Sequence, residues 1–175
     1  MRPLLVVSAS QVPFTDGICR VADDAPARLA PLRQHVLGHN RAVDEAEVDR
    51  WFAAYFADFV ALGRGDIGDV RRILDYYAVP LLVSTDASSV VLTEEAQVRG
   101  MMQNQIDAMR EAGFDRTDQL ASKTIVLNQT CALHRGRFSR LRADGSEITR
   151  FAATYLITDT PAGRRISALV LHTPD

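Results

Sequence analysis

One histidine lies where an imidazole could act as a general base. His134 falls in a segment rich in β-branched and aromatic residues, 123–142, which we expect to form a strand. Alternate residues of a strand face the same side, so His134 shares a face with Ala132, Gly136 and Phe138. Because an imidazole titrates near neutral pH, it could accept a proton from a substrate. The alternative is an exposed or strand-end histidine without a chemical task.

Tyrosine hydroxyls are the candidate hydrogen-bond donors. On the expected strand 147–158, Tyr155 shares a face with Phe151, and its hydroxyl could donate to a carbonyl oxygen on which negative charge develops. Tyr55 and Trp51, on the first expected helix, carry similar donors. The alternative for each is a packed ring whose polar atom bonds to a backbone carbonyl.

Other kinds of site are not indicated by the sequence. The acidic residues fall in turns and helix starts, and only Asp58 and Asp75 lie on helices whose rotation the sequence leaves open. Cys19 and Cys131 are far apart and belong to no CxxC or HExxH pattern, so we expect neither a metal site nor a cofactor. No phosphate-binding glycine loop and no GxSxG turn is present.

Three helical segments are expected to position these residues. The first begins after Asp44, ends at Gly63 and Gly65, and carries apolar residues at three- and four-residue steps. A second helix is expected over 67–77, before Pro80, and a third between an N-cap at Thr93 and Gly113. The apolar face of the first helix comprises Val48, Phe52, Tyr55, Phe56 and Phe59.

The remaining segments predict strands. A short hairpin is expected over 81–83 and 90–92, and three long antiparallel strands over 123–142, 147–158 and 164–173. Asp144 and Gly145 predict a tight turn between the first two long strands. Helices and strands that are segregated along the chain indicate an α+β fold with the helices on one face of a curved sheet.

Composition limits the classes of partner. The chain has 175 residues, 47 % of them hydrophobic, and a formal net charge of −2. We therefore expect no nucleic-acid binding, and four arginines of the strand 123–142 are interpreted as a solvated or dimer-rim face. No apolar run reaches the length of about 18 residues that spans a bilayer, so we expect no membrane insertion and a cytoplasmic location. The four arginines are Arg135, Arg137, Arg140 and Arg142.

The first 43 residues differ from the rest. They hold four of the seven prolines and show no sustained apolar period, so we expect a loosely ordered extension over 1–43 and one domain over 44–175. The apolar stretch 4–7 is too short for a signal-peptide core. The abundance of arginine and the single lysine are typical of a GC-rich bacterial genome.

The order of elements and several short strings resemble the nuclear transport factor 2-like superfamily, in particular its bacterial SnoaL-like members. The strings are an aromatic first helix that leads into Gly65-Asp66, the segment 76–80 with sequence Tyr-Tyr-Ala-Val-Pro, the charged turn 141–146, and the ending 163–166. The resemblance covers residues 44–175. Arg164 departs from it, because tryptophan is common at that place in the family.

The resemblance implies a cone-shaped, curved antiparallel sheet that wraps around an internal pocket, with three helices on its concave side. It also implies a homodimer that forms through the outer face of the sheet. We expect a small apolar molecule in the pocket, with Trp51, Tyr55, Tyr77 and Phe138 in its lining. Because this fold hosts both enzymes and non-catalytic subunits, it does not settle the activity.

Two functions therefore remain open. The first is isomerase, dehydratase or cyclase-like chemistry, with His134 as base and Tyr155 or Tyr55 as donor. The second is a non-catalytic binding or dimerisation module, which the lack of inward carboxylates favours. A buried His134 beside a tyrosine hydroxyl would favour the first function.

Overall fold

The apolar repeat after Asp44 forms helix α1 (Glu45–Arg64) in the computed structural model, which describes residues 43–173. Asp44 is the N-cap, in an extended conformation. Gly65 ends the helix with a φ of 87°, in the left-handed region that favours glycine, and its N–H donates to the carbonyl of Leu62 at 3.1 Å. The expected bounds of this helix are confirmed.

The second helix is shorter than expected. Helix α2 covers only Arg71–Leu74, and the chain is already extended at Tyr77, where strand β1 (Tyr77–Ser84) begins. The cause is tertiary: the N–H of Ile166 donates to the carbonyl of Tyr76 at 2.7 Å, which draws this segment into the sheet. Strand β2 (Ser89–Leu92) then returns beside β1, as the expected hairpin requires.

Helix α3 (Glu95–Glu111) starts one residue later than expected. The N-cap is Glu94 and not Thr93, because Glu94 and Gln97 form a reciprocal capping box. The amide oxygen of Gln97 accepts hydrogen bonds from the N–H groups of both Thr93 and Glu94. At the other end, Gly113 has a φ of 73° and redirects the chain, as its position predicts.

The expected strand 123–142 is two strands. Strand β3 (Phe114–Asn128) and strand β4 (Cys131–Arg142) form a hairpin whose turn contains Gln129 and Thr130. The side chain of Asn128 stabilises this turn by accepting hydrogen bonds from the N–H and the hydroxyl of Thr130. The strand propensity of the whole segment hid this short polar turn.

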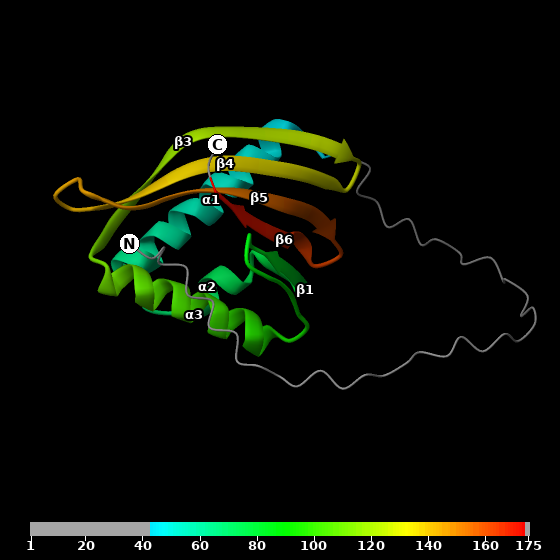
Figure 1. Cartoon of the computed structure of the whole chain (residues 1–175). Coiled ribbons are helices and arrows are strands. Elements are labelled where there is room, and N and C mark those ends of the chain that lie inside the picture. Colours follow the sequence, from blue (N-terminus) through cyan, green and yellow to red (C-terminus); the bar gives the residue numbers. More distant parts are fainter. Residues whose placement is uncertain (1–42, 174–175) are drawn as a thin grey trace, which may run out of the picture. The chain divides into compact units, whose positions relative to one another are not determined.

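The remaining strands follow the expected meander. Strands β5 (Glu147–Thr160) and β6 (Gly163–His172) complete a sheet with the order β2-β1-β6-β5-β4-β3 (Figure 1). The pair β1 and β6 is parallel, which differs from the antiparallel expectation. The two strands are far apart in the sequence, so no hairpin forces them to run in opposite directions. The other pairs are antiparallel.

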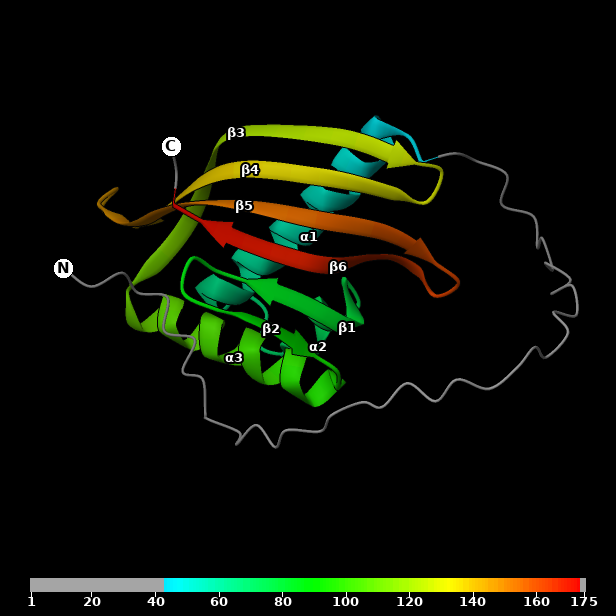
Figure 2. The same cartoon turned by 45° about the vertical axis from the view of Figure 1, so that its right-hand side comes forward.

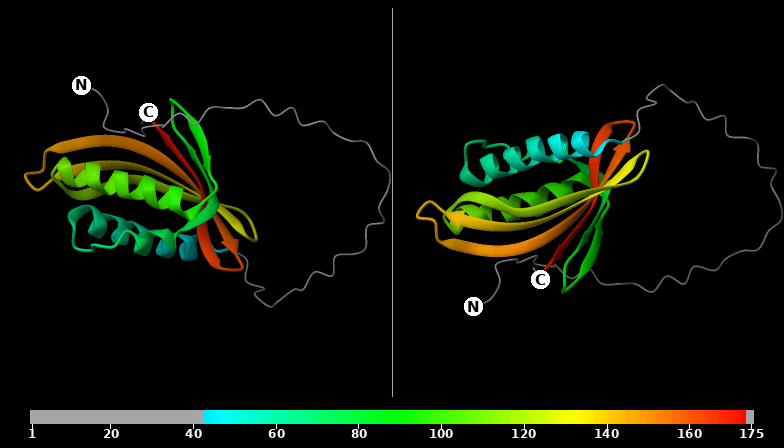
Figure 3. Two further views of the ribbon diagram at one scale, coloured as in Figure 1. Left: turned by 90° about the horizontal axis from the view of Figure 1, so that it is seen from below. Right: turned by 90° about the horizontal axis from the view of Figure 1, so that it is seen from above.

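The helices cover one face of the sheet. The strands curve around α1 and α3, and the sheet stays open at its β2 and β3 edges (Figure 2). Seen from above and below, both long helices lie on the same, concave side (Figure 3). The α+β architecture expected from the sequence is thus confirmed. The expected extension 1–43 and Cys19 lie, apart from Val43, outside the described residues.

Candidate functional site

The inward faces of β4 and β5 are those that strand alternation predicts. Register pairs Phe138 with Phe151 and His134 with Tyr155, and these four side chains are buried against the helices. Gly136 makes room for the aromatic residues, because a Cβ at this position would stand 2.3 Å from the ring of Phe138. The sheet thus presents a row of aromatic rings to the helices.

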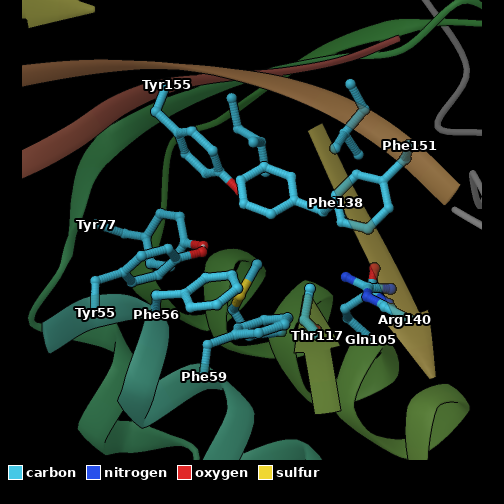
Figure 4. Close-up of a pocket in the computed structure, with 13 residues that line it drawn as sticks. Tyr55, Phe56, Phe59, Tyr77, Gln105, Thr117, Phe138, Arg140, Phe151 and Tyr155 are labelled. Atoms are coloured by element: carbon cyan, nitrogen blue, oxygen red, sulfur yellow. The ribbon is translucent and has the colours of Figure 1, made fainter. Parts of the chain in front are cut away.

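A cavity lies between this row and the helices (Figure 4). The space between its atoms amounts to about 560 Å³, open solvent at the mouth included, and the centre of a water molecule can occupy only about 40 Å³, so the cavity is narrow. Side chains from α1, α3 and the strands β1 and β3–β6 line it. The aromatic walls of the cavity are formed by Phe56, Phe59, Phe138 and Phe151.

Three buried tyrosines contribute hydroxyls to the cavity. The hydroxyl oxygens of Tyr55 and Tyr77 lie 2.7 Å apart, so one hydroxyl donates to the other. The ring of Tyr155 packs against Tyr55 with centroids 6.0 Å apart. Burial raises the pKa of each tyrosine, the charge interaction with a neighbouring phenol raises it further, and Arg140 opposes the shift. The three side chains are therefore neutral at physiological pH and suited to donate hydrogen bonds.

The cavity also contains a buried guanidinium that the sequence reasoning missed. Arg140 is 8 % exposed and lines the cavity beside Thr117, its register partner on β3. Its Cζ atom lies 4.7 Å from the ring centroid of Phe151 and 5.7 Å from that of Phe59, in cation–π contact. Burial lowers the pKa of Arg140, against the opposing effect of the tyrosines, but a guanidinium stays charged in proteins.

The expected solvated arginine face therefore needs a correction. Arg140 lies two residues beyond Phe138, so the alternation that places His134 and Phe138 inward also places Arg140 inward. Arg137 is exposed, and Arg142 is half-buried and donates to the carbonyl of Ala112 at 2.9 Å. The two-residue spacing between Phe138 and Arg140 is the sequence signal from which the inward position of Arg140 could have been predicted.

His134 is buried beside the cavity but does not line it. Its ring stacks on Phe52 with centroids 3.8 Å apart, and its Nδ1 atom lies 2.8 Å from the hydroxyl of Thr124. Thr124 donates its proton to Asp49, so the hydroxyl accepts from the Nδ1–H of His134. The Nε2 atom then carries the lone pair, and within residues 43–173 it has no hydrogen-bond partner.

The electrostatics keep this imidazole neutral. Burial lowers the pKa of His134, while the carboxylate of Asp49, 3.6 Å from Nδ1, opposes the shift. The ring of Tyr155, which lines the cavity, has its centroid 6.4 Å from that of His134. His134 and Tyr155 are neighbours across the strand pair, and the ring of Phe52 packs against both, whereas neither His134 nor Phe52 lines the cavity.

The other residues considered from the sequence divide in two groups. Tyr55, Tyr77 and Phe138 line the cavity, as does Tyr155. Trp51 lies outside the lining and packs edge-on against Tyr76 with centroids 5.4 Å apart. The carboxylate of Asp58 pairs with Arg72 at 3.1 Å and accepts from Tyr76, and Asp75 lines a different hollow.

Metal-binding clusters and membrane-spanning helices are absent from the described part of the chain. Within residues 43–173, no three His, Cys, Asp or Glu side chains gather in a group that could hold a metal ion. Over the same range, none of the helices is both long and apolar enough to cross a membrane. Cys131 is a free thiol whose pKa is raised by burial.

Comparison with solved structures defines the class of protein as an NTF2-like fold. An NTF2-like protein with a cystatin-like fold from Novosphingobium aromaticivorans is 15 % identical, with a TM-score of 0.56 over 74 % of this chain and 81 % of that chain. A candidate calcium/calmodulin-dependent protein kinase II association domain from Xanthomonas campestris is 13 % identical, with a TM-score of 0.54 over 79 % and 98 %. At these identities the likeness shows the fold alone.

A third similar structure is a candidate ketosteroid isomerase from Parabacteroides distasonis, 10 % identical, with a TM-score of 0.52 over 71 % of this chain and 86 % of that chain. The family is shown by sequence: the model of the NTF2-like protein family DUF6841 matches residues 44–174, and the chain belongs to this family. No curated protein sequence matches the chain. The SnoaL-like subgroup stays a prediction.

Proposed function

We propose that this protein binds a small, largely apolar or aromatic molecule in the cavity between α1, α3 and the sheet. One observation carries the proposal: four phenylalanine rings form the walls, and hydrogen-bonding groups stand among them. Such a combination is typical of ligand sites, in which apolar walls supply affinity and a few polar groups set orientation. The hydroxyls of Tyr55, Tyr77 and Tyr155 would hold a carbonyl or hydroxyl oxygen of the ligand.

The geometry supports binding more directly than catalysis. Among the described residues that line the cavity there is no carboxylate and no imidazole, so a general base is missing from its walls. An enzymatic role would need His134 as base and Tyr155 as donor. The unpaired Nε2 atom of His134, whose ring neighbours Tyr155, favours this role. The position of His134 outside the cavity lining opposes it.

The binding proposal is tested by a thermal-shift screen of the full chain against apolar ketones, polyketides, steroids and epoxides. A ligand that binds only the native state raises the melting temperature. Leu171→Trp, on the inward face of β6, is expected to fill the cavity and abolish the shift. Val170→Trp, on the opposite face of the same strand, should preserve it. An equal response of both variants would contradict the cavity as the site.

A second candidate function, assembly into a homodimer through the outer face of the sheet, rests on a separate observation. The strand register aligns one outward apolar residue from each strand into a continuous row across the sheet. Such a row on a sheet face is typical of a protein interface. From β3 to β2, its members are Ile125, Leu133, Leu156, Ala168, Leu82 and Val91.

A further inference from the structure

The two ends of the cavity differ in chemistry. The hydroxyls of Tyr55 and Tyr77 stand at one end, and Arg140, Gln105 and Thr117 stand at the other (Figure 4). Arg140 and Thr117 are register partners on β4 and β3, so the cationic end is built into the sheet and does not depend on a loop.

The guanidinium of Arg140 is unpaired. Among residues 43–173 it makes no hydrogen bond and no ion pair, and its Nε atom is buried without a partner. The hydroxyl of Thr117, also buried, has no partner within the same range. Buried polar groups and charges are normally paired, because an unpaired charge in an apolar site costs several kcal/mol. Phe151 and Phe59 compensate this cost only in part, since a cation–π contact is weaker than the ion pair that normally accompanies a buried charge.

Arg140 also sets the charge of the whole cavity. It is the only ionised side chain in the lining, because the three tyrosines are neutral and no carboxylate takes part within the described residues. A low-dielectric cavity with one uncompensated positive charge attracts a group of charge −1. A guanidinium also matches the planar geometry of a carboxylate better than any other side chain does.

We propose that the ligand of this cavity is an aromatic or apolar monocarboxylate whose carboxylate pairs with Arg140. This inference rests on the proposed binding function and names its ligand class. The hydroxyl of Thr117 and the amide of Gln105 stand beside Arg140 to donate further hydrogen bonds to the carboxylate. The apolar body lies between the phenylalanine walls, and its far end reaches the hydroxyls of Tyr55 and Tyr77.

The test compares acids with their neutral analogues on the full chain. The probes are phenylacetate, 3-phenylpropionate and 4-phenylbutyrate, each paired with the corresponding primary amide, and binding is measured by calorimetry and thermal shift. We expect at least one acid to bind about tenfold or more tightly than its amide, because hydrogen bonds between ionised groups are the strong ones. In Arg140→Met this preference should disappear, and in Arg140→Lys it should be reduced but retained.

Arg137→Met is the matched control, since Arg137 lies on the same strand with an exposed side chain, and it should keep the preference for acids. Amides that bind the wild type as tightly as the acids would overturn the carboxylate inference and leave the binding function intact. Binding of no acid and no amide at millimolar concentration would overturn both proposals.

Thermal stability of the unliganded variants separates ligand binding from a structural role. An unpaired buried charge does not stabilise the fold, so Arg140→Met should melt at or above the temperature of the wild type. A melting temperature well below that of the wild type and of Arg137→Met would show that Arg140 serves packing, and it would count against the proposal.

Discussion

At the scale of single residues, the hydroxyl pair of Tyr55 and Tyr77 joins the first helix to the sheet. The two oxygens are buried and 2.7 Å apart, and their rings meet edge-on with centroids 5.9 Å apart. Removing one partner of a buried hydrogen bond leaves the other unsatisfied, whereas removing both leaves two apolar rings. The pair is therefore suited to a double-mutant cycle.

We expect Tyr55→Phe to lower the free energy of unfolding by about 1–3 kcal/mol, since the hydroxyl of Tyr77 loses its partner. The double variant Tyr55→Phe/Tyr77→Phe should lose less than the sum of the two single variants. Urea unfolding of the four proteins measures the coupling. Additive losses would show that the two hydroxyls do not depend on each other.

The burial of His134 is expected to make the free energy of unfolding depend on pH. Its folded-state pKa lies below the unfolded value of about 6.5. As the pH falls below that unfolded value, the unfolded chain is therefore the first to take up a proton, and stability is lost. Below the folded-state pKa the loss stops growing, because both states are then protonated.

His134→Gln should remove this part of the acid destabilisation, since the amide is neutral and can still bond to Thr124. The measurement is the free energy of unfolding in urea at intervals between about pH 7.5 and pH 5, where an unperturbed histidine titrates. His172→Gln, on β6, carries the same substitution on another element and serves as the matched control. Identical pH profiles for the wild type and His134→Gln would refute the role of His134.

At the scale of elements, the contact between α1 and α3 depends on one glycine. A Cβ on Gly63 would stand 2.6 Å from the methyl carbon of Met109 and 2.7 Å from the ring of Phe114. Gly63 thus lets the end of α1 approach α3 and the start of β3. Gly100, in the exposed part of α3, has nothing within 4 Å of such a Cβ.

The two glycines should respond in opposite directions to alanine. Gly63→Ala should destabilise the protein by about 1–3 kcal/mol, because overpacking outweighs the gain in helix propensity. Gly100→Ala should stabilise it by about 0.5–1 kcal/mol, through propensity alone. Chemical denaturation of both variants measures the difference. Stabilisation by Gly63→Ala would mean that the side chains of Met109 and Phe114 can move away from the new methyl group without a loss of stability.

At the scale of the whole molecule, the outward apolar row and the inward cavity occupy opposite faces of one sheet. Leu133 is the second member of the row from the β3 edge, between Ile125 and Leu156. On the proposed dimer, a charge at this position would be buried without a partner, which strongly disfavours association. The helices on the other face would be unaffected.

Leu133→Glu is therefore expected to convert the proposed dimer into a monomer of half the mass, as measured by size-exclusion chromatography with light scattering. Asn104→Glu, which adds the same charge on the exposed side of α3, should leave the mass unchanged. Circular dichroism of both variants checks that the fold is kept. A wild type that is monomeric at micromolar concentration would argue against assembly through this face.

Local patterns predicted a large part of the fold. The repeat of Val48, Phe52 and Phe59 on α1, the glycines at helix ends and the turn at Gly145 depend on residues close in sequence, and each is found as expected. Sequence reasoning failed at Tyr77, which joins β1 through contacts with β6, and at the hairpin turn after Asn128. In the first case distant partners overrode the local helical pattern, and in the second a short polar turn was hidden within strand-forming residues.

For the candidate site, the sequence by itself determined which residues share a face of each strand, because alternation is a property of the strand alone. Only the tertiary structure decided that Tyr55, Tyr77 and Arg140, from α1, β1 and β4, meet in one cavity while His134 stacks on Phe52 outside its lining. These meetings depend on strand register and on the rotation of α1 against the sheet. Both are set by packing between segments far apart in the chain, which no local pattern encodes.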